Sequence, residues 1–139
     1  LKGFSGVLIT DGYSGYNKVH EAERAGCWAH MRRKWLEAMP EGADAKTCKA
    51  AQGYEFCNRL FELERQFEKL TAEERLEQRK EKSGPVLEAY WTWLNTIPRP
   101  TGKLKGAVTY KRCDACCPNM VQRTFFAIGL RNKKRSISW

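Results

Sequence analysis

A carboxylate and a cluster of basic side chains lie close together near the start of this 139-residue chain. Asp11 follows an apolar run at residues 6–10 and precedes a segment rich in Gly and Tyr. In open α/β sheets, binding and catalytic sites are built where such a strand ends. A carboxylate at that point could belong to a functional site. Asp before Gly is also ordinary turn chemistry, and Asp11 taken alone favours that interpretation.

The basic cluster belongs to residues 27–34, which read Cys-Trp-Ala-His-Met-Arg-Arg-Lys. About two turns of a predicted helix carry its four candidate DNA-binding side chains: His30, Arg32, Arg33 and Lys34. Basic side chains dominate contacts to DNA phosphates, although they also form ordinary solvated helix faces. A lone histidine is ambiguous between ligand, base and structural donor. We interpret the cluster as DNA-binding because it follows Asp11 so closely in the sequence.

Two Cys-containing pairs raise zinc binding as a different hypothesis. The pairs are Cys27-x-x-His30 and Cys113-x-x-Cys116, and the spacing within each suits zinc. The second pair lies in a segment without helical or strand periodicity. Structural zinc sites are rare outside compact Cys/His clusters, which disfavours this hypothesis without removing it.

The elements that must position these residues can be predicted from periodicity and from Pro and Gly. We expect strands at 6–10 and 23–28, and a helix over 29–39 that ends before Pro40 and Gly42. A long amphipathic helix is predicted over 45–70, with Glu64 as the polar exception on its apolar face.

Helix signals continue through the next forty residues. The Thr71–Glu74 segment predicts a capping box that opens a highly charged helix. A break is expected at 83–85, with Pro85 in the first turn of the following helix. After a Pro-rich linker at 97–100, residues 103–110 predict a last helix. Beyond it the periodicity is lost.

The formal net charge of +9 suits a polyanionic partner without choosing between DNA, RNA and an acidic membrane. Residues 111–139 hold seven Lys/Arg against one Asp, so most of the excess lies in this tail. No apolar stretch approaches the length of a membrane span, and the first residues have no signal-peptide pattern. The opening residues read as the middle of a longer protein.

Two segments, taken together, resemble the central part of bacterial transposases of the insertion sequence 66 type. They are Ile9-Thr10-Asp11-Gly12-Tyr13-Ser14-Gly15-Tyr16-Asn17 and Gly26-Cys27-Trp28-Ala29-His30-Met31-Arg32-Arg33-Lys34-Trp35-Leu36-Glu37-Ala38. Further matches are Arg79 and residues 85–87, 93–94 and 100–110, so the resemblance covers about residues 1–110. The Asp-Gly-Tyr element is weak by itself, but the two segments at this spacing are specific.

The resemblance implies a ribonuclease-H-like α/β core interrupted by a mostly helical insertion, and a helix-rich chain overall. Residues 1–40 would be part of the catalytic core and residues 41–110 the insertion. Residues 111–139 form an atypical basic tail, which loses both the periodicity and the family pattern at one point. We interpret this tail as frameshifted or rearranged.

The resemblance also implies the chemistry. In such transposases three acidic residues hold two divalent metal ions, Mg²⁺ or Mn²⁺, which promote cleavage and joining of DNA strands. Asp11 corresponds to the second acid. The first would precede Leu1, and the third follows an Asn-Asn pair that these 139 residues lack. We therefore expect a fragment of a DDE-type transposase that binds no metal and is inactive by itself.

The implied partners are the transposon ends and the target DNA, with homo-oligomers possible for the full-length protein. The expected location is the bacterial cytoplasm, at the nucleoid when bound to DNA, with no membrane partner. The alternative hypothesis is a small non-catalytic nucleic-acid-binding protein that uses the basic helix and the tail.

Overall fold

A computed structural model describes residues 7–11, 15 and 23–110 of the chain. Two short strands, β1 (Val7–Thr10) and β2 (Glu23–Gly26), form a parallel pair with Val7 opposite Glu23 and Thr10 opposite Gly26. The predicted first strand is confirmed. The second is shorter than predicted because helix α1 (Trp28–Ala38) begins almost at once after it.

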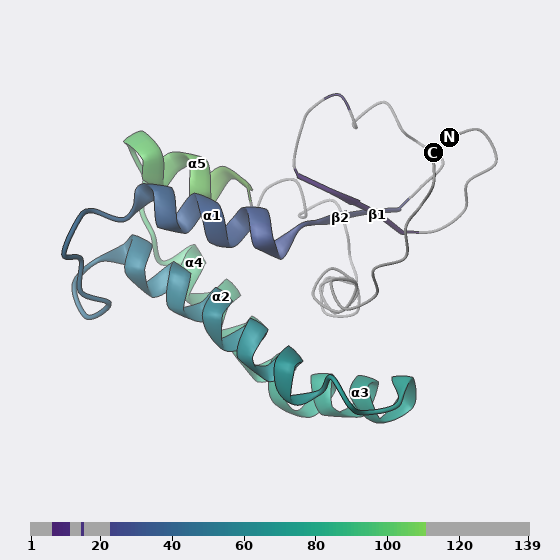
Figure 1. The fold of residues 1–139 in the computed structure, drawn as a ribbon. Coiled ribbons are helices and arrows are strands. Elements are labelled where there is room, and N and C mark those ends of the chain that lie inside the picture. Colours follow the sequence, from purple (N-terminus) through teal and green to yellow (C-terminus); the bar gives the residue numbers. More distant parts are fainter. Residues whose placement is uncertain (1–6, 12–14, 16–22, 111–139) are drawn as a thin grey trace.

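The rest of the described chain is helical. It comprises α2 (Lys49–Gln66), α3 (Ala72–Gln78), a π-helical turn η2 (Arg79–Ser83), α4 (Gly84–Asn95) and α5 (Gly102–Tyr110). Figure 1 shows α2 and α5 on opposite sides of α1, with α4 returning beside α2. The helix-rich composition with a small sheet is as predicted. No helix in the described ranges is long and apolar enough to cross a membrane.

The long helix is shorter at both ends than its apolar pattern predicted. It begins at Lys49 because Asp44 organises a turn before it. The Asp44 carboxylate accepts the Lys46 N–H at 2.9 Å, and its carbonyl accepts the Cys48 N–H at 2.8 Å. Asp side chains compete with helical hydrogen bonding in this way. At the other end, α2 stops at Gln66, four residues before the predicted end.

The capping box at the start of α3 is confirmed. The Glu74 N–H donates to the Thr71 hydroxyl at 3.2 Å, and the Thr71 N–H donates to the Glu74 carboxylate at 2.9 Å. Two N–H groups that the first turn would leave without partners are satisfied by this exchange.

The predicted break at residues 83–85 is wrong, because the backbone stays helical through η2 into α4. Pro85 has no N–H and its ring crowds the preceding turn, which an α-helix accommodates poorly. The helix instead forms one wider turn, in which the hydrogen bond spans five residues and not four. The Gly84 N–H donates to the Arg79 carbonyl, five residues back, as in a π-helix. Pro85 then occupies the first turn of α4, as predicted.

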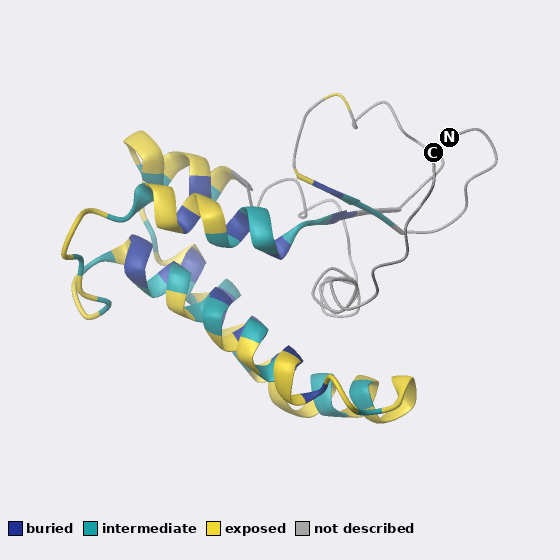
Figure 2. Cartoon of the chain, viewed as in Figure 1, coloured by how far each residue is buried: buried dark blue, intermediate teal, exposed yellow. Residues whose placement is uncertain are grey.

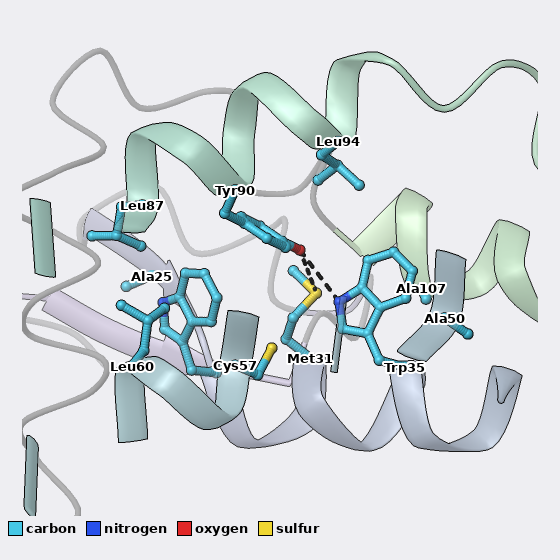
Figure 3. Packing of buried hydrophobic residues seen from close by; sticks show 11 residues of the cluster. Ala25, Met31, Trp35, Ala50, Cys57, Leu60, Leu87, Tyr90, Leu94 and Ala107 are labelled. Atoms are coloured by element: carbon cyan, nitrogen blue, oxygen red, sulfur yellow. Dashed lines mark hydrogen bonds between the residues drawn. The ribbon is translucent and has the colours of Figure 1, made fainter. Parts of the chain in front are cut away.

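One hydrophobic cluster joins α1, α2, α4 and α5, and it includes Ala25 of β2. Figure 3 shows its centre, where the Tyr90 hydroxyl of α4 points between two side chains of α1. It accepts the Trp35 indole N–H at 3.3 Å and donates to the Met31 sulfur at 3.5 Å. Because a buried hydroxyl needs partners, these contacts fix the position of α4 on α1.

A glycine permits the close approach of α1 to α2. At Gly53 in α2, an added Cβ would lie 2.4 Å from Cδ2 of Trp35. The Trp35 ring, which is fully buried, therefore packs directly against the α2 backbone. Any larger residue at this position would have to displace the indole from the core.

Candidate functional site

Asp11 lies at the end of the parallel strand pair. The Cys27 N–H donates to the Thr10 carbonyl at 2.9 Å, which extends the pairing by one step beyond β2. Asp11 therefore leaves the sheet at the same edge as the start of α1, and it is exposed. Strand ends of this kind, next to a helix N-terminus, are where parallel α/β structures place their sites. The structure thus brings the two sequence segments together at one edge.

His30 lies in the first turn of α1 and is half-buried. Its Nδ1 atom is buried and has no hydrogen-bond partner within the described ranges. Buried ring nitrogens are normally hydrogen-bonded. An unsatisfied buried nitrogen three residues after Cys27, which extends the strand pairing, makes His30 a candidate to support this edge of the sheet.

Arg32 points at α2 and is engaged there. Its Nε donates to the Asn58 Oδ1 at 2.7 Å, and its Nη2 donates to the Tyr54 hydroxyl at 2.5 Å. The guanidinium carbon also lies 4.5 Å from the centre of the Tyr54 ring. The guanidinium group is planar and holds its N–H donors in a rigid fork, which suits two fixed acceptors. The observed role of Arg32 is to hold α1 on α2.

Arg33 and Lys34 lie on the opposite, exposed side of α1. The Lys34 ammonium is 3.1 Å from the Glu37 carboxylate, one turn on, with both side chains nearly half exposed. Exposed pairs of this kind contribute little to stability. Both cations are thus accessible to a partner, in contrast to Arg32.

Sequence reasoning missed Tyr54 and Asn58, the two partners of Arg32. Their four-residue spacing on a helix places them on one face, which the sequence could have shown. What it could not show is that this face meets Arg32. The two residues flank Cys57, which is fully buried, and burial raises the pKa of its thiol to about 12 against the opposing charge of Arg32. Cys57 is therefore a packing residue without nucleophilic character.

A groove of about 1100 Å³ lies beside Arg32 along α2. Its lining mixes carboxylates and guanidinium groups, among them Glu55, Arg59 and Glu62, and it does not include Asp11. Because the charges of opposite sign offset one another, the groove has no preference for a polyanion. The groove is therefore separate from the strand end that carries Asp11.

The donor atoms near the strand end decide whether a metal ion fits there. Asp11 offers one carboxylate, a ligand that Mg²⁺ prefers. Within the described parts of the chain, no group of three or more His, Cys, Asp or Glu side chains could hold a metal ion. Asp11 alone could contribute at most one ligand of a metal site. Of the two pairs in the zinc hypothesis, Cys113 and Cys116 lie outside the described residues, as does the whole tail at 111–139.

A model of the family described as "Transposase IS66 family" matches residues 1–115. The chain therefore belongs to the IS66 family of transposases, as the Asp11 segment and the segment at 27–34 indicated. The match includes the strand pair, the sheet edge and all the described helices.

Two proteins of Sinorhizobium fredii are similar to this chain. The uncharacterized protein y4qI is 32% identical over 118 residues, which are 77% of this chain and 21% of the relative. The uncharacterized protein y4hP is 34% identical over 110 residues, 68% of this chain and 20% of the relative. The chain thus spans about a fifth of the length of these curated relatives. No solved structure matches it significantly.

Proposed function

We propose that this chain is part of a DDE-type transposase that acts in DNA transposition by metal-dependent phosphodiester cleavage and strand transfer. Its parallel strand pair would belong to a ribonuclease-H-like catalytic core. The observation that carries the proposal is the position of Asp11, at a strand end beside the helix that bears the family segment.

In this proposal the candidate site residues have different roles. Asp11 supplies one of three carboxylate ligands, the other two lying outside the described residues. The divalent ions, Mg²⁺ or Mn²⁺, would activate the attacking oxygen at a DNA phosphodiester. His30 offers its Nδ1 to the edge, Arg33 and Lys34 bind DNA phosphates, and Arg32 acts as a positioning residue that holds α1 on α2. One carboxylate is too few for two metal ions, so this chain alone is expected to be inactive.

The test uses a full-length family member that carries all three acids. Asp11→Asn should abolish cleavage of a labelled transposon-end duplex while DNA binding stays nearly intact, because Asn keeps the shape but not the charge that a metal site needs. Asp44→Asn is the matched control, since Asn also supports the turn that Asp44 organises. It should cleave like the wild type.

The alternative is a non-catalytic nucleic-acid-binding protein, which the exposed Arg33 and Lys34 and the net charge of +9 favour. It predicts DNA binding with no effect of Asp11→Asn on any activity of the full-length protein. Wild-type cleavage by the Asn variant would falsify the role of Asp11 as a metal ligand and leave the alternative standing.

A further inference from the structure

The cations on α5 and on the linker before it have no carboxylates near them in the sequence. From Ala89 to Tyr110 the chain has Arg99, Lys103 and Lys105 but no Asp or Glu. All three side chains are exposed. None of them has an ion-pair or hydrogen-bond partner among the described residues, and the same holds for Arg33 on α1.

Around the turn between α2 and α3, four cations have partners within the fold. Arg79 pairs with Glu64, Lys80 with Glu77 and Arg65 with Glu62. Arg75 donates to the carbonyls of Glu68 and Leu70. These four cations are matched by carboxylates or carbonyls of the same fold, so they offer little charge to a partner.

α5 is fixed against α1 by its apolar side. Ala107 is fully buried in the common core, and Leu104 and Val108 pack against that core half-buried. Lys103 and Lys105 therefore flank this buried stripe on its two sides, with Gly106 between them on the outer side of the helix, and all three are exposed. Figure 2 shows exposed residues along the outer sides of both α1 and α5, which lie next to each other.

We propose that the exposed sides of α1 and α5 form one surface that binds the sugar–phosphate backbone of duplex DNA. The surface, called here the α1–α5 face, is defined by Arg33, Arg99, Lys103 and Lys105. The inference rests on the proposed function and adds a second helix, to which no DNA role has been assigned. Charge complementarity selects the partner: four exposed cations without an ion-pair partner among the described residues fit a row of phosphates, and phosphate contacts carry no sequence preference.

The dimensions agree with such a contact. The eleven residues of α1 span about 16 Å at about 1.5 Å per residue. Duplex DNA rises about 17 Å over five base pairs, at about 3.4 Å each. Because α1 begins at the Asp11 edge, the α1–α5 face would contact phosphates within roughly five nucleotides of a phosphate held there.

The test measures how salt weakens binding of the full chain to a short duplex of mixed sequence. Lys103→Gln with Lys105→Gln should lower the slope of log affinity against log salt by about 2, since each phosphate contact contributes about 0.9. Arg65→Gln with Lys80→Gln makes the same charge change near the α2–α3 turn, at cations that Glu62 and Glu77 pair, and should leave the slope nearly unchanged. The basic tail is present in every variant, so differences report only the substituted cations.

Substitution of Gly106 provides a second, independent measurement on the same face. An added Cβ at this exposed position meets no atom within 4 Å, so larger side chains fit without strain. Gly106→Glu places a carboxylate between the two lysines and should weaken DNA binding several-fold, whereas Gly106→Gln, of the same size, should not. Circular dichroism and thermal melting confirm that each variant is folded.

The outcomes separate the two proposals. Equal slopes for both double variants would show that only net charge matters, and would overturn the α1–α5 face while leaving the proposed function intact. A selective loss of binding to single-stranded RNA or to an acidic peptide, with duplex DNA unaffected, would also overturn it. Absence of DNA binding by the wild-type chain at about 50 mM salt, where such contacts are strong, would count against the proposed function itself.

Discussion

The α1–α5 face and the helices around the α2–α3 turn are both rich in cations, yet they use them in opposite ways. Near the turn, Arg79 binds Glu64 with both a 2.7 Å Nε–Oε1 and a 2.7 Å Nη2–Oε2 contact, and the two side chains are only 13% and 8% exposed. On α5, Lys103 and Lys105 are exposed and have no carboxylate partner within the described residues. The first arrangement stabilises the fold, and the second leaves positive charge available for a ligand.

The difference teaches that adjacent or similar cations cannot be assigned a role from sequence alone. Arg32 and Arg33 are neighbours in the chain, but only Arg33 is exposed to a partner. A charge contributes to DNA binding when the fold has not already neutralised it, and substitutions at Arg79 and Lys80 and at Arg32 and Arg33 can test that distinction.

The largest effect is expected at the buried ion pair. Arg79→Met should lower the free energy of unfolding by about 3–5 kcal/mol, because it leaves the Glu64 carboxylate buried without a counter-charge. Lys80→Met removes only an exposed pair with Glu77 and should cost less than about 1 kcal/mol. Urea unfolding of the full chain, followed by circular dichroism, measures both.

A double variant sharpens this result. Replacing Glu64 and Arg79 together with Met should recover most of the loss, since a buried pair can be exchanged for apolar residues at little cost. If Arg79→Met were no more harmful than Lys80→Met, the pair would be behaving like a surface contact and the contrast between the two regions would disappear.

The next largest stability changes are expected from alanine substitutions at two helical glycines. Gly53→Ala forces a Cβ into the Trp35 ring and should destabilise the chain by about 1–3 kcal/mol through overpacking. Gly106→Ala meets nothing within 4 Å and should stabilise it by about 0.5–1 kcal/mol through helix propensity. Thermal melting of both variants gives the signs. The same sign for both would show that α1 does not pack on the α2 backbone at Gly53.

The smallest stability effects are expected at Arg32 and Arg33, and these two residues should rank in the opposite order in DNA binding. Arg32→Met should cost about 1–2 kcal/mol, because Asn58 and Tyr54 lose a charged donor. Arg33→Met should change stability by less than about 0.5 kcal/mol, as exposed substitutions usually do. DNA affinity should show the opposite order, with the larger loss for Arg33→Met. Fluorescence anisotropy on a short duplex, alongside urea unfolding, measures both quantities, and parallel losses in the two assays would contradict the separation of roles.

Local signals in the sequence determined several elements directly. The capping box at Thr71 satisfies its own helix start, so no distant partner is needed to predict it. The strand before Asp11 and the position of Pro85 in the first turn of α4 follow from signals that depend only on neighbouring residues. The spacing of the Asp11 segment and the segment at 27–34 was sufficient to predict the family. The ribonuclease-H-like core and the metal ligation by Asp11 stay predictions.

Tertiary structure decided which charges are buried and which are available. Glu64 and Arg79 are fifteen residues apart, and only the return of the chain beside α2 brings them together. The sequence could not show that Pro85 would be accommodated by a π-helical turn, because η2 also packs against α2, where Arg79 pairs with Glu64. Nor could it show that α5 would lie on α1 through Ala107. These contacts join segments far apart in the chain, and their energies arise from burial that a linear pattern does not contain.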